Sequence, residues 1–475
     1  MDYIQLENEM ARYLHLAHKS SLREYNNTDV FEFSMWASPT YWIKENEGGM
    51  SCDTFTWQIV RSRAGDSVAR VIIKKLEGRF IENSKGISMI DVSWMTIQEM
   101  EPEFYQGEIN IKSCYPSIPI RKYGNSEEIL AIRNLQNKFF EHRLHGVDIL
   151  FSISDGATLN IENVTDGTVH GRDAIRQEVN RIINSERLNN HCYKFLGISG
   201  APIIEINEDG NSARGIFTVQ MYRIDAEDKN KSNWTLHRQL CVLESTYIKE
   251  NGAWKIFTMT ISSIVELPIN QYRNDLRYDK CGQSDEPWSV DQVDDSRINI
   301  KTAMEIENII NGWVYGCRRG ELPEYVSRYF DHQGNVRMLI RSFGNKTPVL
   351  ENIEAIREKT NGMTALYKNR FYTFHAPTTP VIAFDNDENH VVGTWFDCGT
   401  TNLGEKQNSP GQVDYMIFVN KYVHRFVKIE GKWYIEDFYA EPMIAMPDWH
   451  LNMLTSSGYV SIPNTDAYPD KFNLA

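Results

Sequence analysis

His237 and Cys241 stand four residues apart in a stretch with strand character. Side chains an even number of residues apart on a strand point to one face, so this pair could bind Zn²⁺ or line a pocket. Two ligands do not make a zinc site, however, and cysteine is a common core residue. The spacing therefore favours a structural role for Cys241 and leaves His237 as a candidate pocket residue.

Other polar side chains in strand-like stretches could also line a pocket, although tyrosines in such positions more often pack within sheets. They are Tyr193, Tyr247, Tyr372, Tyr415, Tyr422 and the pair His424-Arg425. The sequence contains no glycine-rich phosphate loop, no HExxH, no CxxC and no GxSxG motif. Nothing in it requires a nucleotide, a metal ion or a covalent nucleophile, so we expect no cofactor and no metal.

Composition limits the classes of partner. The 475 residues are 41% apolar and 24% charged with a net charge of −14, which argues against nucleic acid or an anionic membrane as the main partner. Seven cysteines without framework spacing fit a reducing compartment. No apolar run approaches the ~18 residues of a membrane span, and the acidic, helical N-terminus is unlike a signal peptide. We expect a cytoplasmic protein with no membrane contact.

The elements that must position these side chains occur in repeated order. Residues 202–206, 208–211 and 215–217 recur at 380–384, 386–389 and 393–395, at a constant offset of 178 residues. Residues 249–256 (KENGAWKI) recur as 428–435 (KIEGKWYI), 179 residues later, and 173–176 are echoed by 354–357. A fainter third copy begins the chain, where residues 65–70 resemble 210–214. Such self-similarity indicates tandem structural units.

Each full copy predicts helices followed by long strands joined by tight turns, which is typical of the α+β class. A strongly curled sheet closed on one side by helices forms a cone whose mouth is a natural small-molecule pocket. The predicted organisation is a degenerate unit at 1–118, full units at 119–267 and 301–442, a connecting segment at 268–300, and a C-terminal tail at 443–475.

The order of these motifs resembles that of a known family. A helix, then xRDAI, then PxIxIxxDGxxARGxF and YxxxNGxWKI are similar to the SnoaL-like polyketide cyclase/dehydratase branch of the NTF2-like superfamily. The resemblance covers about 126–265 and, more loosely, 302–440. It implies tandem NTF2-like (cystatin-like) cone domains, each a curled antiparallel sheet packed on helices.

The resemblance also implies an acid–base set of a Tyr and an Asp on the first helix and a His at the start of the long sheet. His191 matches this His and is the candidate general acid or base. Phe139 and Leu144 occupy the Tyr and Asp positions of the middle unit, and Trp313 and Arg318 occupy them in the third, so both pairs are lost. A structural alternative for His191, a strand-start histidine bound to a backbone carbonyl, stays open.

The remaining candidates surround these positions. Asn369 takes the place of the family His in the third unit, and His375 follows six residues later. The substrate-binding candidates are Tyr193, His237, Phe139, Trp313, Asn369 and His375.

Two functions follow. The first is a cofactor-independent lyase or isomerase, of dehydratase or cyclase type, acting on a small apolar carbonyl metabolite such as a polyketide, steroid-like or aromatic compound. The second is a non-catalytic binding or scaffolding protein. Polar groups that converge on His191 in an open cone would favour the enzyme, whereas a cone filled by Phe139, Trp313 or neighbouring aromatics would favour the binder. The family resemblance further predicts association through sheet faces, either as a homo-oligomer or as a trimer-like monomer.

Overall fold

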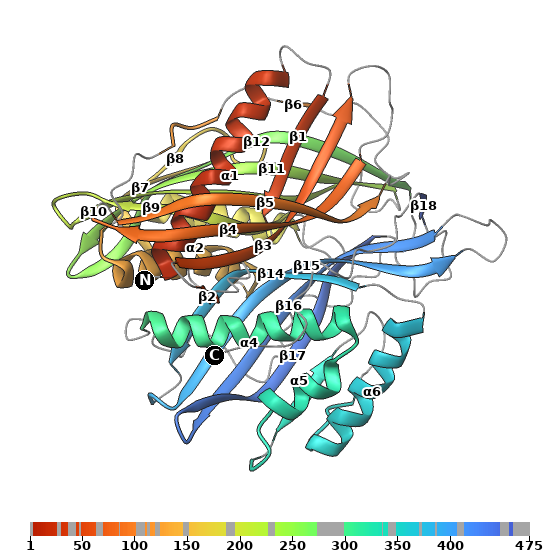
Figure 1. The fold of residues 1–475 in the computed structure, drawn as a ribbon. Coiled ribbons are helices and arrows are strands. Elements are labelled where there is room, and N and C mark those ends of the chain that lie inside the picture. The colour runs from red at the N-terminus through yellow and green to blue at the C-terminus, as the bar shows by residue number, and fades with distance from the viewer. Residues whose placement is uncertain are drawn as a thin grey trace.

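The computed structural model divides the chain into three consecutive units, each with a curled sheet and at least one helix along it (Figure 1). It describes residues 3–25, 30–36, 44–46, 49–62, 70–84, 86–100, 110–111, 115–118, 124–145, 152–186, 195–226, 233–272, 299–334, 336–340, 348–369, 373–384, 387–405, 413–446 and 456–458. The fold is α+β, as the sequence predicts.

The first unit is one long helix on an antiparallel sheet. Its elements are α1 (Tyr3–Tyr25), β1 (Val30–Trp36), β2 (Lys44–Asn46), β3 (Gly49–Ser62), β4 (Arg70–Asn83) and β5 (Gly86–Met100). The strands follow the order β1-β3-β4-β5, with β2 beside β3. The turn predicted at 65–70 falls largely outside the described residues.

The second unit has a larger sheet in the order β8-β7-β12-β11-β10-β9. Its elements are α2 (Ser126–His145), β7 (Ile153–Ile161), β8 (Val169–His170), α3 (Arg172–Glu186), β9 (Phe195–Ile206), β10 (Ser212–Ala226), β11 (Asn233–Glu250) and β12 (Ala253–Tyr272). The short β6 (Asn110–Ile111), which lies within the first 118 residues, pairs with β12. The end of the first unit thus adds a strand to the second sheet.

The third unit repeats this plan with the order β13-β17-β16-β15-β14. Its elements are α4 (Ile300–Arg319), α5 (Leu322–Tyr329), β13 (Arg337–Ile340), α6 (Ile353–Asn369), β14 (Thr373–Phe384), β15 (His390–Glu405), β16 (Val413–Ile429), β17 (Lys432–Met446) and β18 (Ser456–Gly458). Local chemistry sets the ends of α4, because the Asn299 side chain caps its first turn and Gly320 ends it at φ 66°. The C-terminal segment β18 pairs with β16 of the same sheet.

Backbone geometry supports the repeat inferred from the sequence. Ala201 in β9 and Thr379 in β14, 178 residues apart, both have positive φ (46° and 56°), and pairing with the next strand shifts register at both places. The turns at 251–252 and 430–431 both place two residues at positive φ. Equivalent bulges and equivalent turns bend both sheets in the same way.

One feature differs from the expected antiparallel sheet. β7 pairs with β12, and β13 with β17, in parallel. In both units a helix and three long strands separate the two partners, so the connection is long enough to permit the parallel direction.

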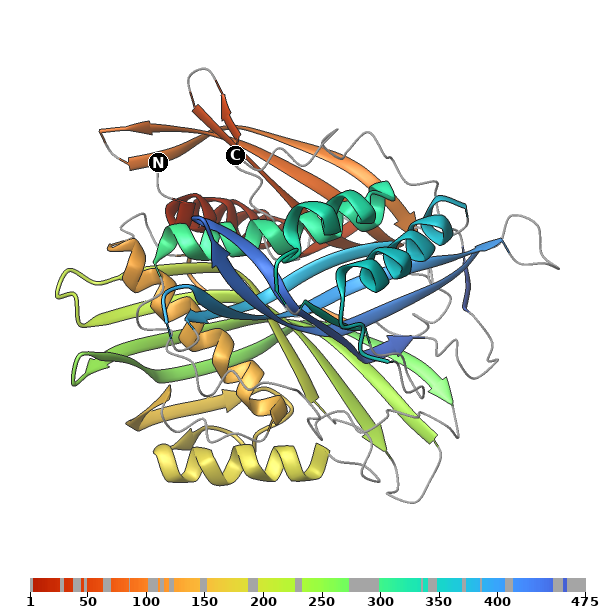
Figure 2. The same cartoon turned by 90° about the horizontal axis from the view of Figure 1, so that it is seen from below.

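The three units pack into one body in which a helix of one unit contacts the sheet of the next (Figure 2). Asn8 on α1 exchanges two hydrogen bonds with the backbone of Ile204 in β9, at 2.9 and 3.4 Å. Asn134 on α2 donates to the carbonyl of Ile382 in β14 at 3.2 Å. Ile204 and Ile382 are equivalent by the repeat, so the contact between the first and second units is repeated between the second and third.

Candidate functional site in the third unit

A histidine and an aspartate meet on neighbouring strands of the third sheet. His375 lies near the start of β14, and Asp397 lies in β15. The His375 Nδ1–H donates to Asp397 Oδ2 at 2.6 Å. His375 was predicted as a pocket residue, but no aspartate partner was assigned to it.

Three further donors hold the Asp397 carboxylate in place. The backbone N–H of Ala376 donates to Oδ1 at 2.9 Å, and the Tyr422 hydroxyl donates to Oδ2 at 2.7 Å. The Asn420 side chain donates to Oδ2 at 3.2 Å. Because Asp397 accepts the Nδ1 proton, it fixes the imidazole so that Nε2 is the ring atom that can exchange a proton with a ligand.

The Asp397 and His375 side chains differ in how deeply they are buried. Asp397 is fully buried, whereas the His375 side chain keeps 10% of its surface exposed. The Phe418 ring packs beside the His375 ring, with centroids 5.1 Å apart. A buried carboxylate behind a slightly exposed imidazole is the arrangement expected of a general acid–base pair.

His424 lies further along the same face of β16, two residues from Tyr422. Its Nδ1 accepts the backbone N–H of Tyr439 at 3.3 Å, so the ring proton is on Nε2. Burial lowers the pKa of His424 to about 3, and the ring is therefore neutral at ordinary pH. Its Nε2 is buried, and no hydrogen-bond partner for it occurs among the described residues. His424 can thus donate a hydrogen bond but cannot act as a cationic acid.

Aromatic rings fill the region around His424. Phe438 stacks on the His424 ring with centroids 4.2 Å apart, and Trp313 on α4 lies 4.5 Å from Phe438. Trp313 also packs edge-on against Tyr325 of α5. The predicted pocket residue Trp313 is therefore a core residue that fills one end of the third cone, and His375 and Asp397 lie further along the strands from that end.

The middle unit lacks this pair at the equivalent positions. By the offsets of 178 and 179, His375, Asp397 and Tyr422 correspond to Gly197, Val219 and Leu243.

Helix α2 instead forms its own polar contacts with the middle sheet. Gln136 Oε1 accepts hydrogen bonds from the Ser245 and Tyr247 hydroxyls at 2.9 and 2.8 Å. Phe139, another predicted pocket residue, is 1% exposed and packs edge-on against Phe140. Phe139 is thus a core residue as well.

The other predicted residues are placed only in part. His191 and Tyr193 lie outside the described residues, so their roles stay predictions. His237 is part of β11, and Asn369 is the last residue of α6. The side chains of both residues lie outside the described part of the structure. Within the described part of the chain, no cluster of three His, Cys, Asp or Glu side chains could hold a metal ion.

Two cavities occur elsewhere in the third unit. One, of about 90 Å³, is lined by Met338, Ile340, Pro348, Leu350 and Lys359 beside β13 and α6. The other is an open depression of about 540 Å³ lined by residues of α5: Pro323, Glu324, Ser327 and Arg328. Neither cavity is lined by the residues around Asp397.

The sequence carried one signal for Asp397 that was missed. It is a carboxylate in the middle of a strongly apolar strand (VVGTWFDC), where a charge is costly unless it is paired. That signal marks a buried polar network, although it does not identify the partner.

Comparisons with known proteins agree with this architecture. The SnoaL-like domain family matches residues 125–260 and 300–439, more than half of the chain. The chain belongs to the SnoaL-like domain family, with two tandem copies of the domain. In the described residues, no helix is long and apolar enough to cross a membrane.

Similar solved structures each cover about a third of the chain. The hexachlorocyclohexane dehydrochlorinase LinA-type3 from Novosphingobium barchaimii is 16% identical over 30% of this chain and 89% of its own, with a TM-score of 0.24. The Kfla4162 protein from Kribbella flavida is 14% identical over 31% and 96%, with a TM-score of 0.27. A Nostoc punctiforme protein with a cystatin-like fold is 19% identical over 30% and 95%, with a TM-score of 0.22. No curated protein matches the chain.

Proposed function

We propose that the protein is a cofactor-independent lyase or isomerase that acts on a small, mostly apolar carbonyl compound. The observation that carries this proposal is the His375–Asp397 pair, with its 2.6 Å hydrogen bond and three further donors on the carboxylate. Four donors on one buried carboxylate hold an imidazole in a single orientation, which is what proton transfer at a fixed position requires.

The proposed reaction uses His375 twice. Its Nε2 takes a proton from the carbon next to the substrate carbonyl, and Asp397 stabilises the imidazolium that forms. In a dehydration, the imidazolium then returns the proton to the departing hydroxyl, so that water leaves and His375 is neutral again. In an isomerisation, the proton returns to a different carbon.

The middle unit stays a second candidate for the same chemistry. His191 matches the family histidine, and Tyr193 and His237 would be its neighbours. Gly197 and Val219 supply no counterpart to His375 and Asp397, so a site there would depend on residues outside those described.

A non-catalytic binding or scaffolding role is favoured by one specific observation. The side chains at one end of the third cone pack tightly against one another: Trp313, Phe438 and His424. Such packing maintains the shape of the sheet and does not require a catalytic function. In that case the hydrogen bond between His375 and Asp397 would serve only to satisfy buried polar groups. The proposed binding or scaffolding role also includes association of copies of this protein through their sheet faces.

The test is a rate comparison across a panel of hydroxy-carbonyl compounds. We expect His375→Ala and Asp397→Asn to lower the rate by about 10²- to 10⁴-fold. The matched control is His390→Ala, because His390 forms an exposed pair with Asp387 at 2.9 Å, away from the cone. His191→Ala tests the middle unit. Equal rates for wild type and His375→Ala would remove the third-unit pair from catalysis, and saturable binding without turnover across the panel would favour the binder.

A further inference from the structure

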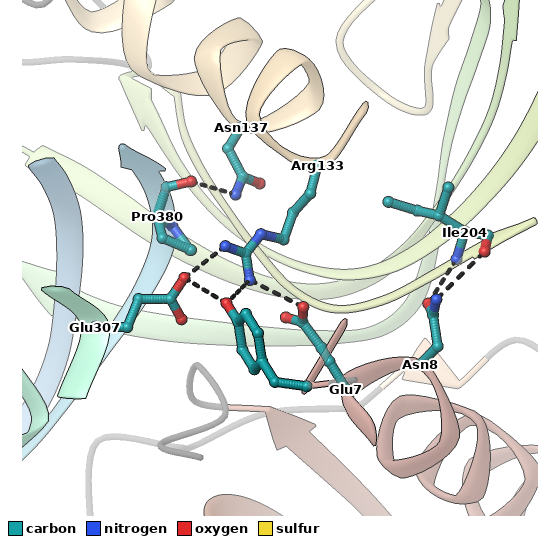
Figure 3. A network of polar contacts seen from close by, with 8 residues as sticks. Glu7, Asn8, Arg133, Asn137, Ile204, Glu307 and Pro380 are labelled. Atoms are coloured by element: carbon teal, nitrogen blue, oxygen red, sulfur yellow. Dashed lines mark hydrogen bonds and ion pairs between the residues drawn. The ribbon is translucent and has the colours of Figure 1, made fainter. Parts of the chain in front are cut away.

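Three buried charged side chains meet where the first helices of the three units come together (Figure 3). Glu7 lies on α1, Arg133 on α2 and Glu307 on α4, and none is more than 5% exposed. Arg133 donates from Nη1 to Glu7 Oε2 at 2.9 Å and from Nη2 to Glu307 Oε1 at 2.5 Å. The Tyr3 hydroxyl donates to the same Glu307 oxygen at 2.9 Å. The junction joins all three units through side chains that face one another.

The three charged residues occupy one repeated position. Each directly precedes an asparagine, at 8, 134 and 308, and the first two asparagines make equivalent contacts with the next unit. The repeat therefore places Glu, Arg and Glu at the same point of three equivalent helices. Three identical units would bring like charges together here, so this arrangement is possible only in a chain whose copies differ.

The charges at the junction do not balance. Two carboxylates and one guanidinium leave one excess negative charge in a region from which water is excluded. Burial raises the pKa of Tyr3 further above its ordinary value, so its hydroxyl stays neutral and supplies no compensating charge. A buried charge without a counter-charge is strongly unfavourable, and a carboxyl group can avoid this cost by keeping its proton.

We propose that the Glu7 carboxyl keeps its proton in the folded protein, and that release of this proton weakens the packing of the three first helices. The inference is independent of the proposed catalytic site. It assigns to the junction a proton-binding role, which links the contact between units to pH.

The electrostatics of Glu7 agree with this inference. Burial, the largest cause, raises the pKa of Glu7 from 4.5 to about 7; the Arg133 guanidinium lowers it, and the Glu307 carboxyl raises it again. The titratable groups that act on one another here are Tyr3 and Glu7 from α1, Arg133 from α2 and Glu307 from α4.

The direction of the pH effect follows from that raised pKa. The folded state keeps a proton that the unfolded chain has already released above pH 4.5. The stabilisation is therefore fully present below pH 4.5 and is lost as pH rises through about 7. This is opposite to the effect of an ion-paired surface carboxylate, whose pKa is lowered.

The experiment compares thermal unfolding of wild type, Glu7→Gln and Glu178→Gln from about pH 5 to about pH 8.5. Glutamine mimics the protonated carboxyl. We expect the unfolding constant of wild type, relative to Glu7→Gln, to rise by up to about tenfold per pH unit until about pH 7 and then to level off. Glu178→Gln is the control. In wild type the hydrogen bond from Arg181 lowers the pKa of Glu178, so this carboxyl does not change its charge over the tested pH range. The profile of this control should follow wild type, and parallel profiles for wild type and Glu7→Gln would overturn the proposal.

A second measurement needs no variant. Infrared spectroscopy of the folded wild-type protein should contain the carbonyl band of a protonated buried carboxyl at about pH 6 that disappears by about pH 8. If Glu7→Gln folds, the band should be missing from it. A wild-type spectrum without a band that titrates in this range would refute a protonated Glu7 even if the variant cannot be purified.

Discussion

Breaking the buried ion pair between Lys421 and Glu141 by changing one partner should destabilise the protein strongly, and the effects of changing both partners should not add. Lys421 Nζ on β16 lies 2.8 Å from Glu141 Oε1 on α2, and the two side chains are 1% and 5% exposed. The pair therefore links the second and third units. Because side chains alternate along a strand, Lys421 points away from the face that carries Tyr422.

The burial of both partners decides the magnitude. An exposed pair contributes only about 0.2–1 kcal/mol, whereas removing one partner of a buried pair costs about 3–5 kcal/mol because the other charge is left in a poor solvent. We therefore expect Lys421→Met and Glu141→Leu each to lower the free energy of unfolding by about 3–5 kcal/mol. The double variant should be less destabilised than the sum of the two single variants, because it removes both members of the pair.

The assay is urea unfolding followed by tryptophan fluorescence, since Trp313 and Trp395 lie in the third unit. A matched control is Lys249→Met, which breaks the half-exposed pair between Lys249 and Glu128, with side chains 22% and 31% exposed. The control should cost about 1 kcal/mol or less. Single variants at 421 and 141 that cost no more than the control, or a double variant as unstable as both singles together, would refute this account of the pair.

Three further changes test the third cone. Trp313→Ala should lower the free energy of unfolding by about 3–5 kcal/mol, measured by urea titration, because it leaves a cavity beside Phe438. Gly393→Ala should cost about 1–3 kcal/mol in the same titration, since the added methyl would overlap the Trp395 ring; an unchanged midpoint would contradict that packing. The pKa of His424 is lowered to about 3 by burial, so the stability linked to its neutral form is present above about pH 6.5 and is lost as pH falls toward 3. His424→Phe should therefore flatten the acid side of the thermal-stability profile, and a profile as steep as that of wild type would argue against a buried neutral ring.

The repeat could be predicted because its signals are local. The turns at 251–252 and 430–431 need positive φ at two successive residues, and Asn-Gly and Glu-Gly supply a glycine at the second. The offsets of 178 and 179 then place β13, β14, β15, β16 and β17 of the third sheet on β7, β9, β10, β11 and β12 of the second. The parallel pairing of β7 with β12 and of β13 with β17 was not predicted, because pairing across a long connection leaves no local trace.

The His375–Asp397 pair could not be predicted from the sequence because it depends on strand register. A β-bulge between Thr378 and Val381 shifts the pairing of β14 with β15, so counting alternate residues from the apolar end of β14 does not fix which face His375 occupies. The family resemblance also directed attention to an acid on the first helix, whereas the acid that contacts His375 lies on a strand.

The distribution of polar residues among the units has an energetic reason. A carboxylate in the apolar wall of a sheet is unfavourable unless its hydrogen bonds are satisfied, and Asp397 satisfies them with donors from His375, Ala376, Asn420 and Tyr422. Such a network requires several positions to change together. In an assembly of identical subunits each change would recur in every copy, but tandem units can restrict it to one copy while the equivalent wall of the middle unit keeps the apolar Val219 and Leu243. The same freedom permits Glu, Arg and Glu at one repeated position of the junction, so both features follow from copies that share one chain.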